Sequence, residues 1–137
     1  MKTSLNNKKY IYTVGRRKTS SARIRLFKGK GESIVNGLSL SDFVKNSKYK
    51  ILLEKPLKLT DTIDNFYFTA KVAGGGVVSQ ISAIVHGISR ALIKVSAEKH
   101  KSILKKAGLL TRDPRERQRR MAGTGGKARR QKQSPKR

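Results

Sequence analysis

The side chains that could perform acid–base or metal chemistry are few in this chain. Its histidines are His86 and His100, cysteine is absent, and eight Asp and Glu residues are scattered over 137 positions. A metal site needs several ligands converging on one ion, and general acid–base catalysis needs groups within reach of one another. We therefore expect no catalytic residue, no metal site and no cofactor. His86 is interpreted as a surface or half-buried residue of a helix.

Two glycine-rich runs invite comparison with phosphate-binding loops. Gly74–Gly76 stands between a predicted strand and a predicted helix, but Val77–Ser79 follow where a P-loop needs Lys and Ser or Thr. Gly126–Lys127 is followed by Ala128, so it fails as well. The triple glycine keeps two interpretations that can both hold. One is a sharp turn between strand and helix, and the other is a close approach of the backbone to an RNA phosphate.

The charge of the chain limits its partners. Thirty-three Lys and Arg residues against eight acidic residues give a formal net charge of +25. A compact domain with this charge repels itself, and RNA, DNA or an anionic membrane surface would relieve the repulsion. No apolar run approaches the roughly 18–20 residues that span a bilayer, and residues 1–9 lack the apolar core of a secretory signal. We expect a polyanion partner and no membrane.

The charge and the apolar residues divide the chain into two parts. Residues 1–111 have a net charge of +16 and contain the aromatic and branched aliphatic residues, whereas residues 112–137 have a net charge of +9 and contain none. The second part cannot bury enough apolar surface to offset its conformational entropy. We predict a globular domain at 1–111 and an extended basic tail at 112–137, which either orders on RNA or is a nonspecific disordered tail.

The second strong cluster of cations is the run Gly15–Lys18, predicted to be a turn beside a sheet that also presents Arg23 and Arg25. Neighbouring hydroxyl groups add further phosphate donors. We favour RNA contact over a merely solvated charged turn. The residues expected to bind RNA are Arg16, Arg17, Lys18 and Arg23 in the domain, with Arg112, Arg115, Arg119, Arg120, Lys127, Arg129, Arg130 and Lys132 in the tail.

The elements that must position these cations follow from hydrophobic periodicity. Alternation of apolar and polar residues predicts strands at 10–14, 22–27, 33–35 and 66–72. After Gly74–Gly76 the period changes to that of a helix, with Ile81, Ile84, Val85, Ile88, Leu92 and Val95 on one stripe. Ser79 could cap this helix, and Arg90 and Lys94 lie on its opposite face. Four strands followed by helices indicate an α+β fold with the helices on one sheet face.

Shorter helices are predicted on either side of that stripe. A helix at 97–107 has Ser96 as its N-cap and Gly108 just beyond its end. Between residues 40 and 54 the pattern allows two short helical pieces, the second of them stopped by Pro56. Asp113–Glu116 has the residue types of a helix start, so a helical turn there is plausible.

Four groups of residues, spread over nearly the whole chain, form a recognisable series. They are Gly15–Lys18 with Ala22 and Arg23; Gly74–Gly76 with Gln80, Ala83, Ile84, His86–Ile88 and Arg90–Leu92; Lys106–Asp113; and Lys127–Arg130 with Lys136 and Arg137. The series resembles the bacterial-type small-subunit ribosomal protein nine family. The chain departs from that family at its end, where Gln133–Pro135 lacks the aromatic residue that is often found there.

The resemblance implies a fold, a partner and a location. The fold would be the two-layer α/β sandwich of the ribosomal-protein S-five domain-two type, with a four-stranded sheet, helices on one face and a left-handed βαβ unit. The protein would bind the 3′ major domain of small-subunit rRNA in the head, beside neighbouring head ribosomal proteins. Its tail would reach peptidyl-site tRNA through Lys136 and Arg137. The ribosome would be that of a bacterial cytoplasm, with a plastid stroma as the alternative.

Two rival functions remain open on the residues alone. A nucleoid or chromatin-type DNA-binding protein would share the charge and the steep salt dependence of binding. An enzyme acting on a phosphate-rich substrate would need convergent acid–base groups, which the sequence does not offer.

Overall fold

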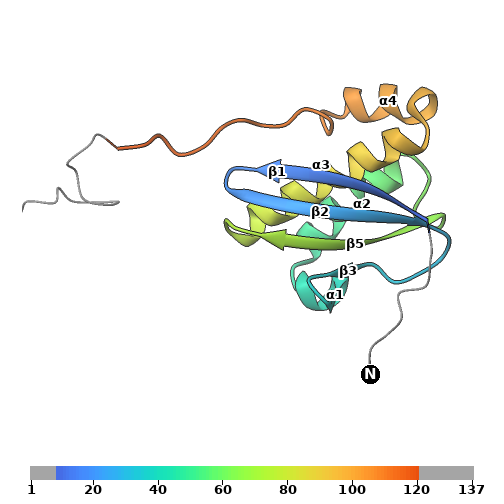
Figure 1. Cartoon of the computed structure of the whole chain (residues 1–137), viewed down its shortest axis with the longest axis horizontal. Helices are drawn as coiled ribbons and strands as arrows, with labels where there is room; N and C mark the ends of the chain where they lie inside the picture. Colours follow the sequence, from blue (N-terminus) through green and yellow to red (C-terminus); the bar gives the residue numbers. More distant parts are fainter. Residues whose placement is uncertain (1–8, 121–137) are drawn as a thin grey trace, which may run out of the picture.

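The computed structural model describes residues 9–120 of the chain (Figure 1). Three long antiparallel strands dominate it, and two short strands complete a single sheet in the order β1-β2-β5-β3-β4. The strands are β1 (Tyr10–Arg17), β2 (Ser20–Lys28), β3 (Ile34–Val35), β4 (Leu38–Ser39) and β5 (Phe66–Ala73). The helices are α1 (Leu40–Phe43), α2 (Ser47–Leu59), α3 (Val77–Val95) and α4 (Ala97–Lys106). The α+β class is confirmed.

The core lies between the sheet and the helices, because each long strand alternates apolar and polar side chains. Ala22, Ile24 and Leu26 of β2 are at most 2% exposed, as is Phe68 of β5, and they face the helices α2 and α3 behind the sheet in Figure 1. Their buried neighbours on α3 include Ile81, Ile84, Val85, Ile88 and Leu92, so this predicted stripe is confirmed. Val95, at 37% exposed, is the one predicted stripe residue that stays outside the core.

The sheet has five strands, so the predicted number of four was wrong. Asn36 and Gly37 both have positive φ angles, 51° and 85°, which is the geometry of a two-residue hairpin turn. The turn brings Leu38–Ser39 back against β3 as β4. A strand of two residues has too little alternation to be detected from the sequence. Beyond this hairpin, β3 runs parallel to β5, and α1 and α2 connect the two.

Helix α2 continues through Pro56 to Leu59, so the prediction that Pro56 stops it was wrong. A proline inside a helix removes one backbone hydrogen bond and usually bends or ends it. Here Pro56 is buried, as are Leu53 and Leu57 on the same face. The hydroxyl of Thr60 donates to the carbonyl of Pro56 at 3.0 Å, which closes the last turn. Packing of the apolar face against α3 therefore outweighs the lost hydrogen bond.

Helix α3 begins at Val77 with Gly76 as its N-cap, so its cap lies before the predicted cap Ser79. Helix α4 begins after Ser96 as predicted, although the Ser96 side chain makes no capping hydrogen bond. Its end is also as predicted, since Gly108 has a φ of 70°. The amides of Gly108 and Leu109 donate back to the carbonyls of Lys105 and Leu104 at 3.0 and 3.1 Å, which forms a Schellman motif.

Helix α3 lies so close to β1 and β2 that glycines are required at two positions of the contact. A Cβ atom on Gly15 would lie 1.9 Å from the carbonyl oxygen of Ala83, and one on Gly87 would lie 2.5 Å from Ile24 Cγ1. Beside them the buried hydroxyl of Thr13 donates to the carbonyl of Gly87 at 2.8 Å. Gly15 is thus a strand residue beneath the helix, and the predicted turn at Gly15–Lys18 shrinks to Lys18 and Thr19.

Side chains of α3 also occupy the outer edge of β1. His86 Nδ1 accepts from the amide of Arg16 at 3.3 Å, Arg90 donates to the carbonyl of Val14, and Lys94 donates to that of Tyr12 at 3.0 Å. The spacing matches because four helical residues rise about 6 Å and two strand residues about 6.7 Å. Arg90 and Lys94, expected on the face opposite the apolar stripe, therefore reach back to the sheet.

Within residues 9–120 no helix is both long and apolar enough to cross a membrane. In the same part of the chain, no three His, Asp or Glu side chains gather where they could hold a metal ion.

Candidate RNA interface

The tip of the β1–β2 hairpin presents cations to solvent. Arg17 pairs with Ser20 across the two-residue turn of Lys18 and Thr19, and Lys18 has a φ of 50°. Lys18 and the side chain of Arg16 are exposed. Two of the three predicted cations at this tip are thus placed where a phosphate could reach them.

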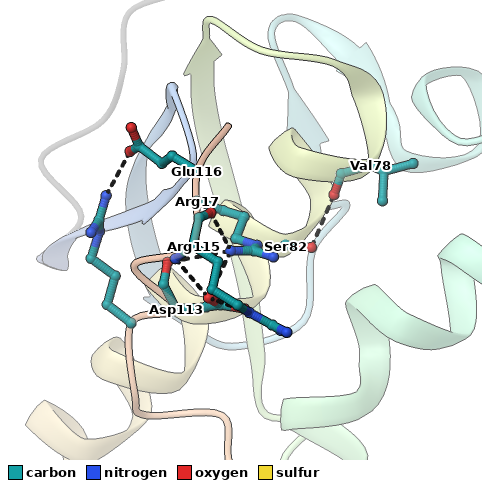
Figure 2. A network of polar contacts seen from close by, with 7 residues as sticks. Arg17, Val78, Ser82, Asp113, Arg115 and Glu116 are labelled. Atoms are coloured by element: carbon teal, nitrogen blue, oxygen red, sulfur yellow. Dashed lines mark hydrogen bonds and ion pairs between the residues drawn. The ribbon is translucent and has the colours of Figure 1, made fainter. Parts of the chain in front are cut away.

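Arg17 points in another direction and joins the hairpin to the start of the tail (Figure 2). Its Nη1 lies 2.9 Å from Asp113 Oδ1 and donates to the carbonyls of Arg115 and Asp113 at 3.1 and 3.4 Å. The side chain of Arg17 is 20% exposed. These contacts connect residues 96 and 98 positions apart in the chain. Arg17 therefore positions the tail. Its contact with RNA stays a prediction.

Asp113 is the centre of this contact. Arg115 Nη2 lies 2.7 Å from Asp113 Oδ2, and Arg115 Nε donates to both carboxylate oxygens at 3.0 and 3.1 Å. The hydrogen bonds from Arg115, together with the charges of Arg115 and Arg17, hold the pKa of Asp113 well below its usual range. The same bonds, which Asp113 accepts, and the negative charge of Asp113 raise the pKa of Arg115. We call the group Arg17, Asp113 and Arg115 the tail anchor.

The helical turn considered at Asp113–Glu116 does not form. Asp113 Oδ1 accepts the amide of Arg115, two residues on, at 2.9 Å. This local bond folds the backbone into an Asp-centred turn that competes with a helix. The residues from Thr111 to Arg120 then leave the domain with neither helix nor strand, and Figure 1 shows this segment running away from the sheet.

The other predicted tail cations fall into two groups. Arg112 lies 3.5 Å from Glu116, with both side chains more than 40% exposed, and Arg119 and Arg120 are exposed. The remaining predicted residues lie outside the described part of the chain. They are Lys127, Arg129, Arg130, Lys132, Lys136 and Arg137.

A hollow of about 300 Å³ joins the hairpin to the tail anchor. Its lining includes Arg16, Arg17, His86, Thr111 and Asp113. Burial lowers the pKa of His86 below its ordinary value, and the charges of Arg90 and Arg112 lower it further, against a backbone hydrogen bond with Leu110. A neutral His86 keeps Nδ1 free to accept the Arg16 amide. His86 is half-buried, as interpreted from the sequence, and serves as a structural acceptor.

The triple glycine lies against the same hairpin tip. Gly74 and Gly75 have φ angles of 79° and 64°, and a Cβ atom on Gly75 would lie 2.2 Å from Ser20 Oγ. Ser20 donates to the carbonyl of Gly74 at 2.9 Å, and Gln80 donates to the same oxygen at 3.2 Å. Backbone conformation and close packing account for Gly74 and Gly75, and Gly76 is the N-cap of α3, so the turn interpretation is confirmed. The phosphate interpretation stays a prediction.

Arg23 is separate from the tip, on the sheet face that points away from the helices. Arg25 and Lys71 are exposed on this face as well. Lys71 was missed as a candidate because it is the single cation of its strand and stands in no run of charges. The pairing of β2 with β5 places it directly opposite Arg23, which only the strand register reveals.

A basic α+β domain with an anchored, arginine-rich C-terminal segment is typical of a protein that binds nucleic acid. Residues 15–137 match the model of the family described as ribosomal protein S9/S16. The chain is 44% identical over 120 residues to "Small ribosomal subunit protein uS9" of Maridesulfovibrio salexigens, an alignment that covers 88% of this chain and 92% of that protein. The chain therefore belongs to the ribosomal protein S9 family, as the resemblance indicated.

Membership defines the general role of the chain. It is a structural constituent of the small ribosomal subunit and acts in translation as an rRNA-binding protein. The family is one of structural ribosomal proteins, which agrees with the non-enzymatic interpretation of the sequence.

Proposed function

We propose that this protein binds the 3′ major domain of small-subunit rRNA, in the head, through two connected basic surfaces. One is the hairpin tip with Arg16 and Lys18, and the other is the tail that begins at Arg112. The tail anchor carries this proposal, because it fixes where the basic segment leaves the domain and sets it beside the hairpin cations. Arg and Lys side chains in this arrangement neutralise phosphates without reading base sequence.

The end of the chain has a second role in this proposal. Lys136 and Arg137 contact tRNA in the peptidyl site, as the resemblance to the family implies. Neighbouring proteins of the head contact the remaining surface of the domain. The particle is the ribosome of a bacterial cytoplasm, which the bacterial relative supports, or of a plastid stroma.

The fold in this proposal is that of the ribosomal-protein S-five domain-two type. The parallel pairing of β3 with β5, joined through α1 and α2, supplies the βαβ unit that this type requires. We propose that the crossover of this βαβ unit is left-handed. An experimental structure of the full chain would test the handedness at residues 34–73.

Deletion of Lys136 and Arg137 tests the role of the chain end. Reconstituted small subunits that carry the shortened protein should sediment normally and bind peptidyl-site tRNA more weakly than subunits with the full chain. The matched control is the double variant Lys105→Gln, Lys106→Gln, which removes two charges from the exposed end of α4. Equal tRNA affinity for the deletion and the full chain would disprove the tRNA contact.

The rRNA part of the proposal is tested by a salt wash. The full chain should remain with small subunits through the wash, and the double variant Arg16→Gln, Lys18→Gln should leave at lower salt because two phosphate contacts are lost. A chain that sediments free of subunits, or binds duplex DNA as tightly as the rRNA domain, would contradict it.

A further inference from the structure

The sheet face that points away from the helices has an unusual composition. Residues alternate across a strand, so the outward positions of β1, β2 and β5 share this face. It carries Tyr10, Tyr12, Arg23, Arg25, Phe27, Tyr67, Thr69 and Lys71. These three strands contain no Asp or Glu. We call this surface the open sheet face.

Two cations of the open sheet face stand directly opposite each other. Arg23 of β2 is the cross-strand partner of Lys71 of β5. Like charges in this position destabilise a sheet, and no carboxylate on the three strands offsets them. Neither side chain makes a hydrogen bond or an ion pair to another residue in the range 9–120. The repulsion is relieved when an anion lies between them.

The same pair of cations lines two adjoining hollows. One, of about 230 Å³, is lined by Tyr12, Arg23, Arg25, Thr69 and Lys71. The other, of about 600 Å³, shares Arg23, Thr69 and Lys71 and extends over Ser21 to the β3–β4 hairpin. Together they form a shallow path across the strands, with hydroxyl groups of Ser21 and Thr69 along it.

Some aromatic side chains beside this path already contact other rings or a cation, and one is exposed to solvent. Phe27 stacks on Tyr67 with ring centroids 5.1 Å apart, Tyr10 lies 5.7 Å from Phe27, and Arg25 lies over the Tyr10 ring at 5.2 Å. These contacts hold one row of the sheet together. Tyr12 lies outside this cross-strand row of Tyr10, Phe27 and Tyr67. It is 45% exposed, and it lines the smaller hollow. Its ring is therefore placed to receive a flat ligand beside the cations Arg23, Arg25 and Lys71, which line the same hollow.

A phosphate-bearing chain with exposed bases fits all three observations. An exposed aromatic ring can stack on any of the four bases. Cations and hydroxyl groups beside the ring bind the phosphates that flank the stacked base. A duplex offers phosphates but keeps its bases stacked inside, so it would leave Tyr12 unused. An acidic protein surface would neutralise the cations but has no need of the ring.

We propose that the open sheet face binds an unpaired stretch of rRNA, with Tyr12 stacking on a base and Arg23 and Lys71 holding a phosphate between them. The inference rests on the proposed function, since it adds a second surface for the same RNA partner. It predicts that the domain holds RNA on the sheet as well as at the hairpin tip and the tail.

The absence of cysteine allows a direct test inside the assembled particle. Thr69→Cys places one thiol between the two hollows. When hydrogen peroxide is added, an Fe(II) chelate attached to this thiol reduces the peroxide to hydroxyl radicals, which cleave nearby RNA backbone. The wild-type chain treated with the same reagent is the unlabelled control. Sedimentation of the labelled protein with small subunits reports the proposed function, and cleavage of unpaired rRNA nucleotides reports the open sheet face.

The two readouts separate the possible failures. Labelled protein that assembles while the rRNA stays uncut, or is cut only within duplex regions, overturns the inference and leaves the proposed function standing. In particles assembled with unlabelled Thr69→Cys protein, crosslinking of the free thiol to a neighbouring protein would assign the face to a protein partner. Failure of both the wild-type and the labelled chain to sediment with subunits overturns the proposed function, and the inference with it.

Substitutions at Tyr12 test the stacking with the isolated full chain. Tyr12→Leu should weaken binding to a single-stranded RNA of about 12 nucleotides by roughly tenfold, whereas Tyr12→Phe keeps the ring and the affinity. Affinity for an RNA hairpin duplex should be unchanged in both variants. Equal affinities of Tyr12→Leu and Tyr12→Phe for the single strand would refute the stacking.

Lys71→Gln distinguishes a loss of RNA binding from a loss of folding, because it should increase the stability of the free protein and decrease its affinity for RNA. Removal of the cross-strand repulsion should raise the urea midpoint of the free protein, while affinity for the single-stranded RNA falls. Lys101→Gln on α4 removes the same charge from an exposed site and serves as the control. A Lys71→Gln protein that binds the single strand as tightly as Lys101→Gln would count against the phosphate contact.

Discussion

The sharpest steric requirement at the residue scale is Gly15. Its missing side chain lets α3 lie on β1, with Ala83 oxygen where a Cβ atom would be. We predict that Gly15→Ala lowers the free energy of unfolding by roughly 2–3 kcal/mol, because the helix must move away from a packed core. Urea denaturation of the full chain measures the change.

Gly76→Ala is the matched control for that substitution. A Cβ atom on Gly76 meets nothing within 4 Å, so the expected loss is below about 1 kcal/mol, as for an alanine at a helix N-cap. Similar losses for the two variants would show that the contact with α3 tolerates a methyl group.

His86 makes the stability depend on pH in a known direction. Burial lowers its pKa in the folded protein below the value of about 6.5 of the unfolded chain. As the pH falls below about 6.5, His86 binds a proton in the unfolded chain but not yet in the folded protein, so the free energy of unfolding falls. The contribution is fully present above that pH.

The His86→Gln variant isolates this contribution. Urea denaturation at about pH 7.5 and about pH 5.5 should give a smaller loss of stability for the variant than for the wild type. His100 is present in both proteins and cancels in the comparison. A loss of equal size in the two proteins would contradict the role of His86.

The tail anchor operates at the scale of elements, because it couples a hairpin to a segment nearly 100 residues away. Arg17→Gln should speed hydrogen exchange of the Arg115 amide several-fold, although Arg17 contacts the Arg115 carbonyl and not that amide. An exposed ion pair is worth about 1 kcal/mol or less, so the free energy of unfolding should change by less than this. Amide exchange followed by NMR measures the effect.

Arg112→Gln is the comparison for that experiment. It removes a cation from the same segment and breaks the weaker 3.5 Å contact with Glu116. The Arg115 amide should exchange at the wild-type rate in this variant. If both substitutions speed exchange equally, loss of charge and not the anchor is the cause.

The elements also show what the sequence could and could not predict. The long strands and α3 were predictable because many residues repeat one period. The continuation of α2 through Pro56 was not, because it depends on burial against α3. The strand position of Gly15 and the pairing of Arg17 with Asp113 depend on contacts between distant segments, which no local pattern contains.

The candidate interface divides in the same way. Its charge was predictable from composition. Arg16, Lys18 and Arg23 are exposed, as a contact with RNA requires, and their role in binding stays a prediction. The structure added Lys71 and Tyr12 through strand register. It also gave Arg17 a structural role that a count of cations could not indicate.

At the scale of the whole molecule, the division of the chain at Thr111 can be tested. The buried hydrophobic residues of the described part run from Ala22 to Leu104. Within residues 112–120, Arg17 joins the tail to the domain through Asp113 and Arg115. A chain ending at Thr111 should therefore fold, with a free energy of unfolding within about 1 kcal/mol of the full chain. Circular dichroism and urea denaturation measure this.

The same truncation should change RNA binding strongly. Eleven Lys and Arg residues are removed, so the affinity for an rRNA fragment and its dependence on salt should both fall. An unfolded 1–111 chain would contradict the boundary, and an unchanged salt dependence would contradict the binding role of the tail.

The row of α3 side chains on the outer edge of β1 has a consequence for the protein before it meets RNA. An exposed strand edge is a template on which a second copy can pair, and this can lead to aggregation. Here His86, Arg90 and Lys94 already bond one backbone group each of Arg16, Val14 and Tyr12, and the opposite edge is the two-residue β4. Copies of the protein that have not yet bound RNA are therefore protected against aggregation by edge-to-edge strand pairing.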